Sequence, residues 1–337
     1  MNFDDLLYRS TPELQVITPY YNPCGYRTRR RNYELFASTL RRSGIPLLTI
    51  ECAFGRQPFN LEPALNVVHI RSRSLVWQKE RLLNLAVSWL PRSVKFVAWI
   101  DCDLLFENPE WATETVSALR AYPLVQVFES CNRLPRRNLA GIEKGDICYS
   151  FGALAPDDPT LLATGNFEDH GHTGYGWAAR RELLDTHKLY EYAIAGSGDH
   201  YIAHAALGDV DGPCIRRMMC DNRTLINHFT DWARPFSRSV RGRVGVVAGT
   251  VLHLWHGELK HRHYMHRHVQ IVKAGFNPST DIVAAPGKPL EWRPGPTRSK
   301  LSRFFAQYFT ARREDGTKRG TPTHTHNTRS HSHVNKT

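Results

Sequence analysis

The stretch Lys95-Phe96-Val97-Ala98-Trp99-Ile100-Asp101-Cys102-Asp103 is an apolar run that ends in two carboxylates. A continuous apolar run predicts a strand that is buried on both faces, as in a parallel sheet. Ligands of open α/β sheets bind at the carboxyl ends of the strands, where Asp101 and Asp103 fall. An extended backbone would point both carboxylates the same way, with Cys102 opposite. Because two neighbouring negative charges need neutralising, the motif indicates a divalent cation and a phosphorylated ligand.

Short Asp-x-Asp triplets also occur on solvated loops, so the flanking sequence bears on the interpretation. The segment after the triplet is typical of a helix start, with Asn108 as the N-cap and Pro109 as the first helical residue. The strand, the two acids and a helix over 109–122 would form one βα unit.

The first third of the chain alternates between predicted strands and helices. Strands are expected at 14–18, 46–51, 66–70 and 124–128, and helices at 26–42 and 77–90. This alternation predicts an α/β fold with a mostly parallel central sheet flanked by helices. Residues 132–169 lack periodicity, which favours a binding loop or lid, and helices follow at 178–187 and about 199–207.

We expect one domain over 1–292, with a nucleotide-binding half at about 12–130 and a smaller acceptor and metal half at about 131–275. A basic helix over 293–315 and a disordered His-, Thr- and Arg-rich tail over 316–337 would follow. The start of the chain has no signal-peptide pattern, and no apolar stretch is long enough to span a bilayer. The seven cysteines are scattered without a C-x-x-C pair, which favours reduced thiols in a cytoplasmic protein.

A net charge of +12 raises the question of a nucleic-acid partner. From Arg293 onward, ten Lys/Arg face two Asp/Glu, so most of the surplus lies at the C-terminal end, away from any aromatic platform. This placement argues against a specific nucleic acid. A nucleic-acid-binding protein or metal-dependent nuclease remains one alternative, and a sugar nucleotidyltransferase is a second.

Taken in order, the motifs of about residues 14–275 resemble the GT-A glycosyltransferases, which are family 2-like here, with β-1,4-galactosyltransferase features in the second half. The resemblance implies a GT-A (Rossmann-like) fold and a hexosyltransferase-type activity on a nucleotide-diphosphate sugar, here a UDP-sugar. Asp101 and Asp103 match the D-x-D motif that holds Mn²⁺ or Mg²⁺ against the diphosphate. The expected nucleotide contacts are Thr18, Tyr20 and Asn22 in the first-strand loop, Glu51 at the end of the second strand, Asp101, and Lys79 toward the phosphates. Arg29, Arg30, Arg31 and Arg81 are further candidates for phosphate contacts.

The second half of the chain supplies the acceptor side of the resemblance. Gly174, Tyr175, Gly176 and Trp177 resemble the loop beside the acceptor and the transferred sugar. Asp199 in Gly196-Ser197-Gly198-Asp199 resembles the catalytic base, although it could equally be a helix N-cap. The signature places its acids closer to the Gly-Trp loop than Asp199 lies here, so Asp169 competes for the role.

His253 and His256 resemble the late histidine that completes the metal shell, with His256 slightly favoured. The six histidines between 253 and 268 match no closed zinc shell. Because a base-assisted direct displacement needs one acid only, we expect inverting transfer to a hydroxyl of a glycan, lipid or protein. Glu80 and Asn84 lie one helical turn apart and could be structural or contact a sugar.

Overall fold

The computed structural model describes residues 13–136 and 146–316, so the predicted tail from 317 onward lies outside the described residues. A seven-stranded sheet forms the centre of the fold, in the order β10-β6-β9-β4-β1-β2-β3. Its strands are β1 (Leu14–Tyr20), β2 (Leu47–Phe54), β3 (Val67–Ser72), β4 (Phe96–Ile100), β6 (Leu124–Gln126), β9 (Gly176–Arg180) and β10 (Val244–Val246). All neighbours pair in parallel except β9, which is antiparallel to both β4 and β6. The predicted α/β fold with a mostly parallel central sheet is confirmed.

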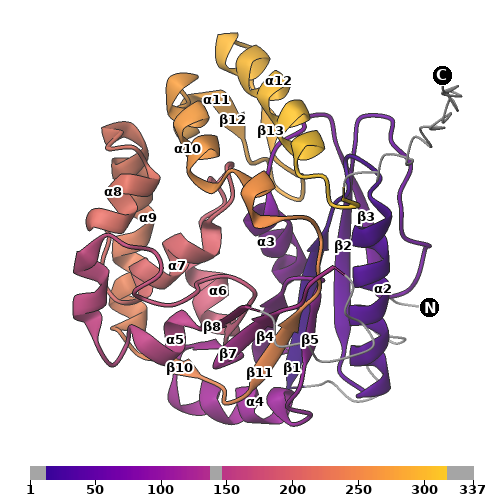
Figure 1. The fold of residues 1–337 in the computed structure, drawn as a ribbon, viewed down its shortest axis with the longest axis vertical. Coiled ribbons are helices and arrows are strands. Elements are labelled where there is room, and N and C mark those ends of the chain that lie inside the picture. Colours follow the sequence, from indigo (N-terminus) through magenta and orange to yellow (C-terminus); the bar gives the residue numbers. More distant parts are fainter. Residues whose placement is uncertain (1–12, 137–145, 317–337) are drawn as a thin grey trace, which may run out of the picture.

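Helices cover both faces of this sheet, and a smaller sheet lies beside it (Figure 1). The helices are α2 (Arg27–Arg42), α3 (Lys79–Trp89), α4 (Trp111–Ala121), α5 (Phe151–Leu154), α6 (Arg181–His187), α7 (Gly198–Ala206), α8 (Pro213–Met218), α9 (Arg223–Val240), α10 (Tyr264–Lys273), α11 (Pro278–Asp281) and α12 (Pro296–Ala311), with 3-10 turns at Pro159–Thr164 and Leu259–Arg262. The smaller sheet has the order β5-β11-β7-β8 and consists of β5 (Leu104–Phe106), β7 (Ser130–Arg133), β8 (Asp146–Tyr149) and β11 (Thr250–His253). A two-stranded ribbon joins β12 (Ile282–Val283) to β13 (Glu291–Trp292).

Strand β4 is buried on both faces, as its sequence predicts. Val97 and Trp99 belong to the hydrophobic core that also contains α3, α7 and α9 residues. Ala98 and Ile100 belong to the core on the other face, with α2 and α4. Alternate side chains therefore enter different cores, which is why the run shows no polar positions.

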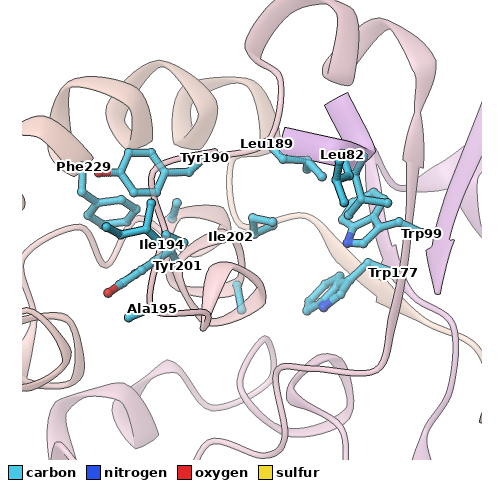
Figure 2. Close-up of a cluster of buried hydrophobic side chains, with 14 of the residues drawn as sticks. Leu82, Trp99, Trp177, Leu189, Tyr190, Ile194, Ala195, Tyr201, Ile202 and Phe229 are labelled. Carbon is cyan, nitrogen blue, oxygen red and sulfur yellow. The ribbon is translucent and has the colours of Figure 1, made fainter. Parts of the chain in front are cut away.

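The core under α7 and α9 is rich in aromatic side chains (Figure 2). Trp99 of β4 pairs with Trp177 of β9 in the sheet register, and Ile202 of α7 packs in the same core. Tyr190 contacts Phe229 at a ring-centroid distance of 5.4 Å. This packing holds α7 against the sheet and thereby fixes the start of α7, which faces the cavity described below.

Two local predictions were wrong. Residues 178–180 are not helical but form the end of β9, and the helix begins only at Arg181. The N-cap of α4 is Glu110 rather than Asn108, and the Asn108 side chain instead accepts a hydrogen bond from the Glu110 backbone N–H. Among the helices of the described ranges, none combines the length and apolar character needed to cross a bilayer.

Candidate active site

A cavity of about 340 Å³ lies at the carboxyl ends of β1 and β4, with Pro19, Tyr21, Asp101 and Asp103 in its wall. The strand order changes direction here, because β2 and β3 lie on one side of β1 and β4 lies on the other. Ligands of open α/β folds bind at such a switch point. The volume falls in the range of small-molecule sites.

Asp103, His253 and His256 meet on one wall of the cavity. One ligand atom from each lies within 4.8 Å of the other two. The His256 Nε2 atom lies 3.0 Å from Asp103 Oδ2 and 3.1 Å from His253 Nε2. The register of the smaller sheet explains the meeting, because β5 follows Asp103 directly and pairs Leu104 with His253 at the end of β11.

The chemistry of these three side chains fits a metal ion. Asp103 Oδ1 is buried and has no hydrogen-bond partner among the described residues. Burial lowers the pKa of His253 and His256, which favours the neutral imidazole that a metal requires. Burial also raises the pKa of Asp103, so this carboxylate gains from a neighbouring cation.

Asp101 was predicted as a metal ligand together with Asp103, but its carboxylate has a different partner. Lys79 Nζ lies 2.6 Å from Asp101 Oδ1 and 2.7 Å from Asp199 Oδ2. The backbone leaves the extended conformation after Ile100 and turns at Cys102 and Asp103, so the alternation of an extended strand does not continue through this segment. The structure therefore groups Asp103 with the two histidines and Asp101 with Lys79.

Asp199 lies in the first turn of α7 and faces the cavity. The N-cap of α7 is Ser197, so the alternative role of Asp199 as an N-cap is wrong. Burial lowers the pKa of Lys79, but the nearby Asp101, Asp199 and Glu80 outweigh it and hold this pKa well above its ordinary value. Burial raises the pKa of Asp199 in spite of Lys79. A charged lysine thus separates two carboxylates at the floor of the cavity.

Glu80 is a buried carboxyl in the cavity wall, and both of its oxygens lack a hydrogen-bond partner among the described residues. It packs against Gly198, where an added Cβ would lie 2.0 Å from Glu80 Oε1. Burial, and then the charge of Asp199, raises the pKa of Glu80 to about 8. Glu80 is therefore a proton-bearing neighbour of Asp199 at neutral pH.

The substitution Glu80→Gln should remove a pH dependence of stability. The ordinary pKa of 4.5 applies to the unfolded chain, and the folded value is about 8. Between these values the folded protein keeps a proton that the unfolded chain has released, so this group lowers the free energy of unfolding as pH rises. The free energy of unfolding of Glu80→Gln should therefore rise, relative to that of wild type, by about 1.4 kcal/mol for each pH unit in this window. Urea unfolding at several pH values measures the difference, with the exposed Glu62→Gln as the control. A constant difference across the window would contradict the prediction.

Arginine side chains surround the remainder of the cavity: Arg29, Arg262, Arg267 and Arg312 line it together with Lys79. Of the predicted phosphate contacts, Arg29 and Lys79 are therefore in the wall. Arg30 pairs with Glu34 on the surface of α2, and Arg81 binds Glu191 and the carbonyl oxygen of Lys288.

The segment after α12 completes this side of the cavity. Arg312 Nε donates to Glu314 Oε1 at 2.5 Å, and Glu314 Oε2 lies 3.6 Å from Arg29 Nη1. The same carboxylate lies 3.8 Å from His256 Nδ1. Burial raises the pKa of Glu314, but Arg312 and Arg29 outweigh it and hold the pKa well below its ordinary range. A carboxylate from the far end of the chain thus links the arginines to the histidine cluster.

Four predicted nucleotide contacts do not line the cavity: Thr18, Tyr20, Asn22 and Glu51. The Thr18 hydroxyl donates to the carbonyl oxygen of Ile100 inside the sheet, and Tyr20 is fully buried. Asn22 closes the turn before α2 by accepting from the Tyr26 N–H. Glu51 accepts from the backbone N–H groups of Asn60 and Leu61. Thr18 thus bonds between two strands of the sheet, whereas Asn22 and Glu51 are engaged in holding loops.

The predicted acceptor loop is only partly in the cavity wall. Gly174 and Tyr175 line the cavity, and the Tyr175 ring stacks on His172 at 4.1 Å. Gly176 and Trp177 are part of β9, and the buried Trp177 donates its indole N–H to the carbonyl oxygen of Thr173. Asp169 does not line the cavity and instead accepts a hydrogen bond from Asn166.

Several side chains of the cavity are not among the predicted site residues, including Arg262, Arg312 and His172. Arg262 Nη2 donates to His256 Nε2 at 2.8 Å. The alternation of Arg, Lys and His after His256 was the available signal for Arg262. Arg312 follows α12, close to the C-terminal end of the described residues and far in sequence from the strands that form the cavity. No local pattern therefore identifies it.

Comparison with known proteins yields distant structural matches. No protein-family model matches the chain, and neither does any curated protein sequence. The catalytic domain of Drosophila β1,4-galactosyltransferase 7 in complex with xylobiose matches at 15% identity with a TM-score of 0.29. A mutant of the same enzyme in complex with manganese, UDP-Gal and xylobiose matches at 13% identity with a TM-score of 0.31. Each match covers 56% of this chain, and 58% and 59% of those chains.

Two further structural matches cover more of the chain. Mannosyl-3-phosphoglycerate synthase from Rubrobacter xylanophilus matches at 12% identity and a TM-score of 0.37, over 83% of both chains. 4-Diphosphocytidyl-2C-methyl-D-erythritol synthase from Anaerococcus prevotii matches at 12% identity and a TM-score of 0.34, over 70% of this chain and 86% of that one. The matched structures thus include glycosyltransferases, the class that the sequence resembles.

Proposed function

We propose that this protein is a divalent-metal-dependent glycosyltransferase that uses a nucleotide-diphosphate sugar, here a UDP-sugar. One observation carries the proposal: Asp103, His253 and His256 converge at the strand switch point, in a cavity that arginines surround. Departure of a nucleoside diphosphate places negative charge on its phosphates, and fixed cations stabilise that charge.

Asp103, His253 and His256 are the residues that would hold the metal. When bound, a divalent cation supplies Lewis-acid stabilisation of the leaving diphosphate. The two imidazoles favour Mn²⁺ over Mg²⁺, because Mg²⁺ prefers oxygen ligands. Asp101 would act through Lys79, because their ion pair positions the charged ammonium group at the cavity floor.

The arginines would bind the diphosphate. Arg29, Arg262 and Arg312 lie next to the histidine cluster or to Glu314, which contacts it. Guanidinium groups match phosphate oxygens with paired hydrogen bonds. A small neutral ligand would not need such a concentration of positive charge.

Asp199 would be the base that takes the proton of the acceptor hydroxyl. It lies in the cavity wall, and the packing of α7 on the sheet fixes its position. Neighbouring Glu80, whose raised pKa keeps it protonated at neutral pH, is unsuited to that task. A single available carboxylate base supports direct displacement with inversion.

A thermal-shift panel tests the proposal. UDP should raise the melting temperature in the presence of Mn²⁺ and much less without it, and purine nucleotides should act weakly. At a ligand concentration of 100 times Kd the expected stabilisation is about 2.7 kcal/mol. Stabilisation by no nucleoside diphosphate in the presence of any divalent metal would contradict the proposal. Release of pyrophosphate instead of a nucleoside diphosphate from the substrates would identify a nucleotidyltransferase.

A further inference from the structure

A second cluster of metal-ligating side chains borders the cavity, because one of its members, His170, is part of the cavity wall. His170, His204 and Cys214 each offer one ligand atom within 4.8 Å of the other two. His170 precedes β9, His204 lies on α7, and Cys214 lies on α8. All three side chains are buried, with exposed fractions of 1%, 0% and 0%.

The hydrogen bonds of the two histidines engage one ring nitrogen of each and leave the other available to a ligand. His170 Nδ1 lies 2.9 Å from the carbonyl oxygen of Gly171, and His204 Nδ1 lies 2.7 Å from Asp209 Oδ2. Both partners are acceptors, so both Nδ1 atoms carry the proton. In a neutral imidazole each Nε2 atom then presents a lone pair.

These two Nε2 atoms have no partner in the described part of the chain, although both are buried. A buried polar atom without a hydrogen bond is costly. Metal-ligating histidines have this same arrangement, with one ring nitrogen on the metal and the other donating to a carbonyl or carboxylate. The two unpaired nitrogens thus point to a missing ligand rather than to ordinary packing.

We propose that His170, His204 and Cys214 bind a structural Zn²⁺ ion. Imidazole and thiolate ligands together select zinc over the harder cations. Binding would form a zinc–sulfur bond and release the thiol proton of Cys214 to solvent. His200 is a further donor near the cluster, because its Nε2 atom is also buried without a partner and its ring centroid lies 4.1 Å from that of His204.

The location gives this ion a structural role that does not depend on the proposed glycosyl transfer. A zinc ion here would tie the loop of His170 to α7 and α8. That loop continues into His172 and Gly174 of the cavity wall, and α7 carries Asp199. One ion would therefore fix two walls of the cavity relative to each other. This site is separate from the Asp103 cluster and has a different ligand chemistry.

Zinc analysis of the full-length chain, purified without a polyhistidine tag and dialysed against a weak chelator, tests the proposal. We expect about one zinc per chain by mass spectrometry. Cys214→Ser and His204→Gln should each lose it. Cys220→Ser, a nearby cysteine outside the cluster, and Asp103→Asn should retain it.

Cobalt substitution gives a spectroscopic readout of the thiolate ligand itself. Wild-type protein loaded with Co²⁺ should show a thiolate-to-cobalt charge-transfer band in the near ultraviolet, and Cys214→Ser should not. Zinc that is retained in both Cys214→Ser and His204→Gln would place the metal at another site and overturn the proposal. Wild-type protein with neither zinc nor the cobalt band would overturn it as well.

Discussion

Asp103→Asn should abolish Mn²⁺-dependent nucleotide binding while the protein stays folded. Asp103 is the one carboxylate that faces both His253 and His256 among the described residues. Changes to residues that merely support a metal ligand cost 10–100-fold in affinity, so loss of a ligand should weaken metal binding by about 100-fold or more. Because burial already disfavours the charged form of Asp103, the neutral amide should leave the metal-free protein as stable as wild type or more so.

Two measurements separate these effects. Calorimetric titration with Mn²⁺ and UDP gives the affinity, and urea unfolding without metal gives the stability. Asp157→Asn, at an exposed position, is the matched control and should change neither. Wild-type metal-dependent binding by Asp103→Asn would show that the Asp103 cluster is not the metal site.

Asp199→Asn should lower the rate of sugar transfer while donor affinity stays near the wild-type value. Loss of a positioned general base typically costs about 10²–10⁴-fold in rate. Lys79 keeps its ion pair with Asp101 in this variant, so the charge at the cavity floor remains compensated. The substitution therefore removes the base without removing a group that we place on the phosphates.

The release of nucleoside diphosphate from the donor, with and without acceptors, measures this rate, and equilibrium binding of UDP measures donor affinity. Asp231→Asn, on the exposed side of α9, is the control. An equal loss of binding and rate would assign Asp199 to donor recognition instead. Retention of the anomeric configuration in the product, read by NMR, would contradict the direct displacement.

The fold was predictable where a local pattern reflects burial. The apolar run of β4 shows no alternation because its two faces enter two cores. The helix predicted over residues 178–180 was wrong because the helix propensity of alanine does not take tertiary packing into account. They lie in β9, which pairs with β4 on one side and β6 on the other. The start of this strand is packed so closely that a side chain larger than glycine would not fit at Gly176. A Cβ at Gly176 would lie 2.8 Å from Val127 Cγ2.

The candidate site was predictable only in part, because many of its contacts join distant segments. Asp103 follows a recognisable strand, and His253 ends another, so both could be found from the sequence. The proton-bearing state of Glu80 depends on the approach of α7 to α3, which no spacing in the sequence reveals. His170 lies 34 residues before His204, and Cys214 lies ten residues after it, so the three come together only when the loop before β9 packs with α7 and α8.

The contacts of Glu314 with Arg29 and His256 also determine when, during synthesis, the cavity can be completed. The ribosome synthesises the chain from its N-terminus, so β1 to β4 can pair long before Glu314 is translated. The wall formed by Arg312 and Glu314 does not exist until then, and Arg29 has no carboxylate to orient it. The nascent protein should therefore acquire its donor-binding competence only when nearly all of the described chain has left the ribosome, and a product truncated before residue 312 should carry the sheet without a finished cavity.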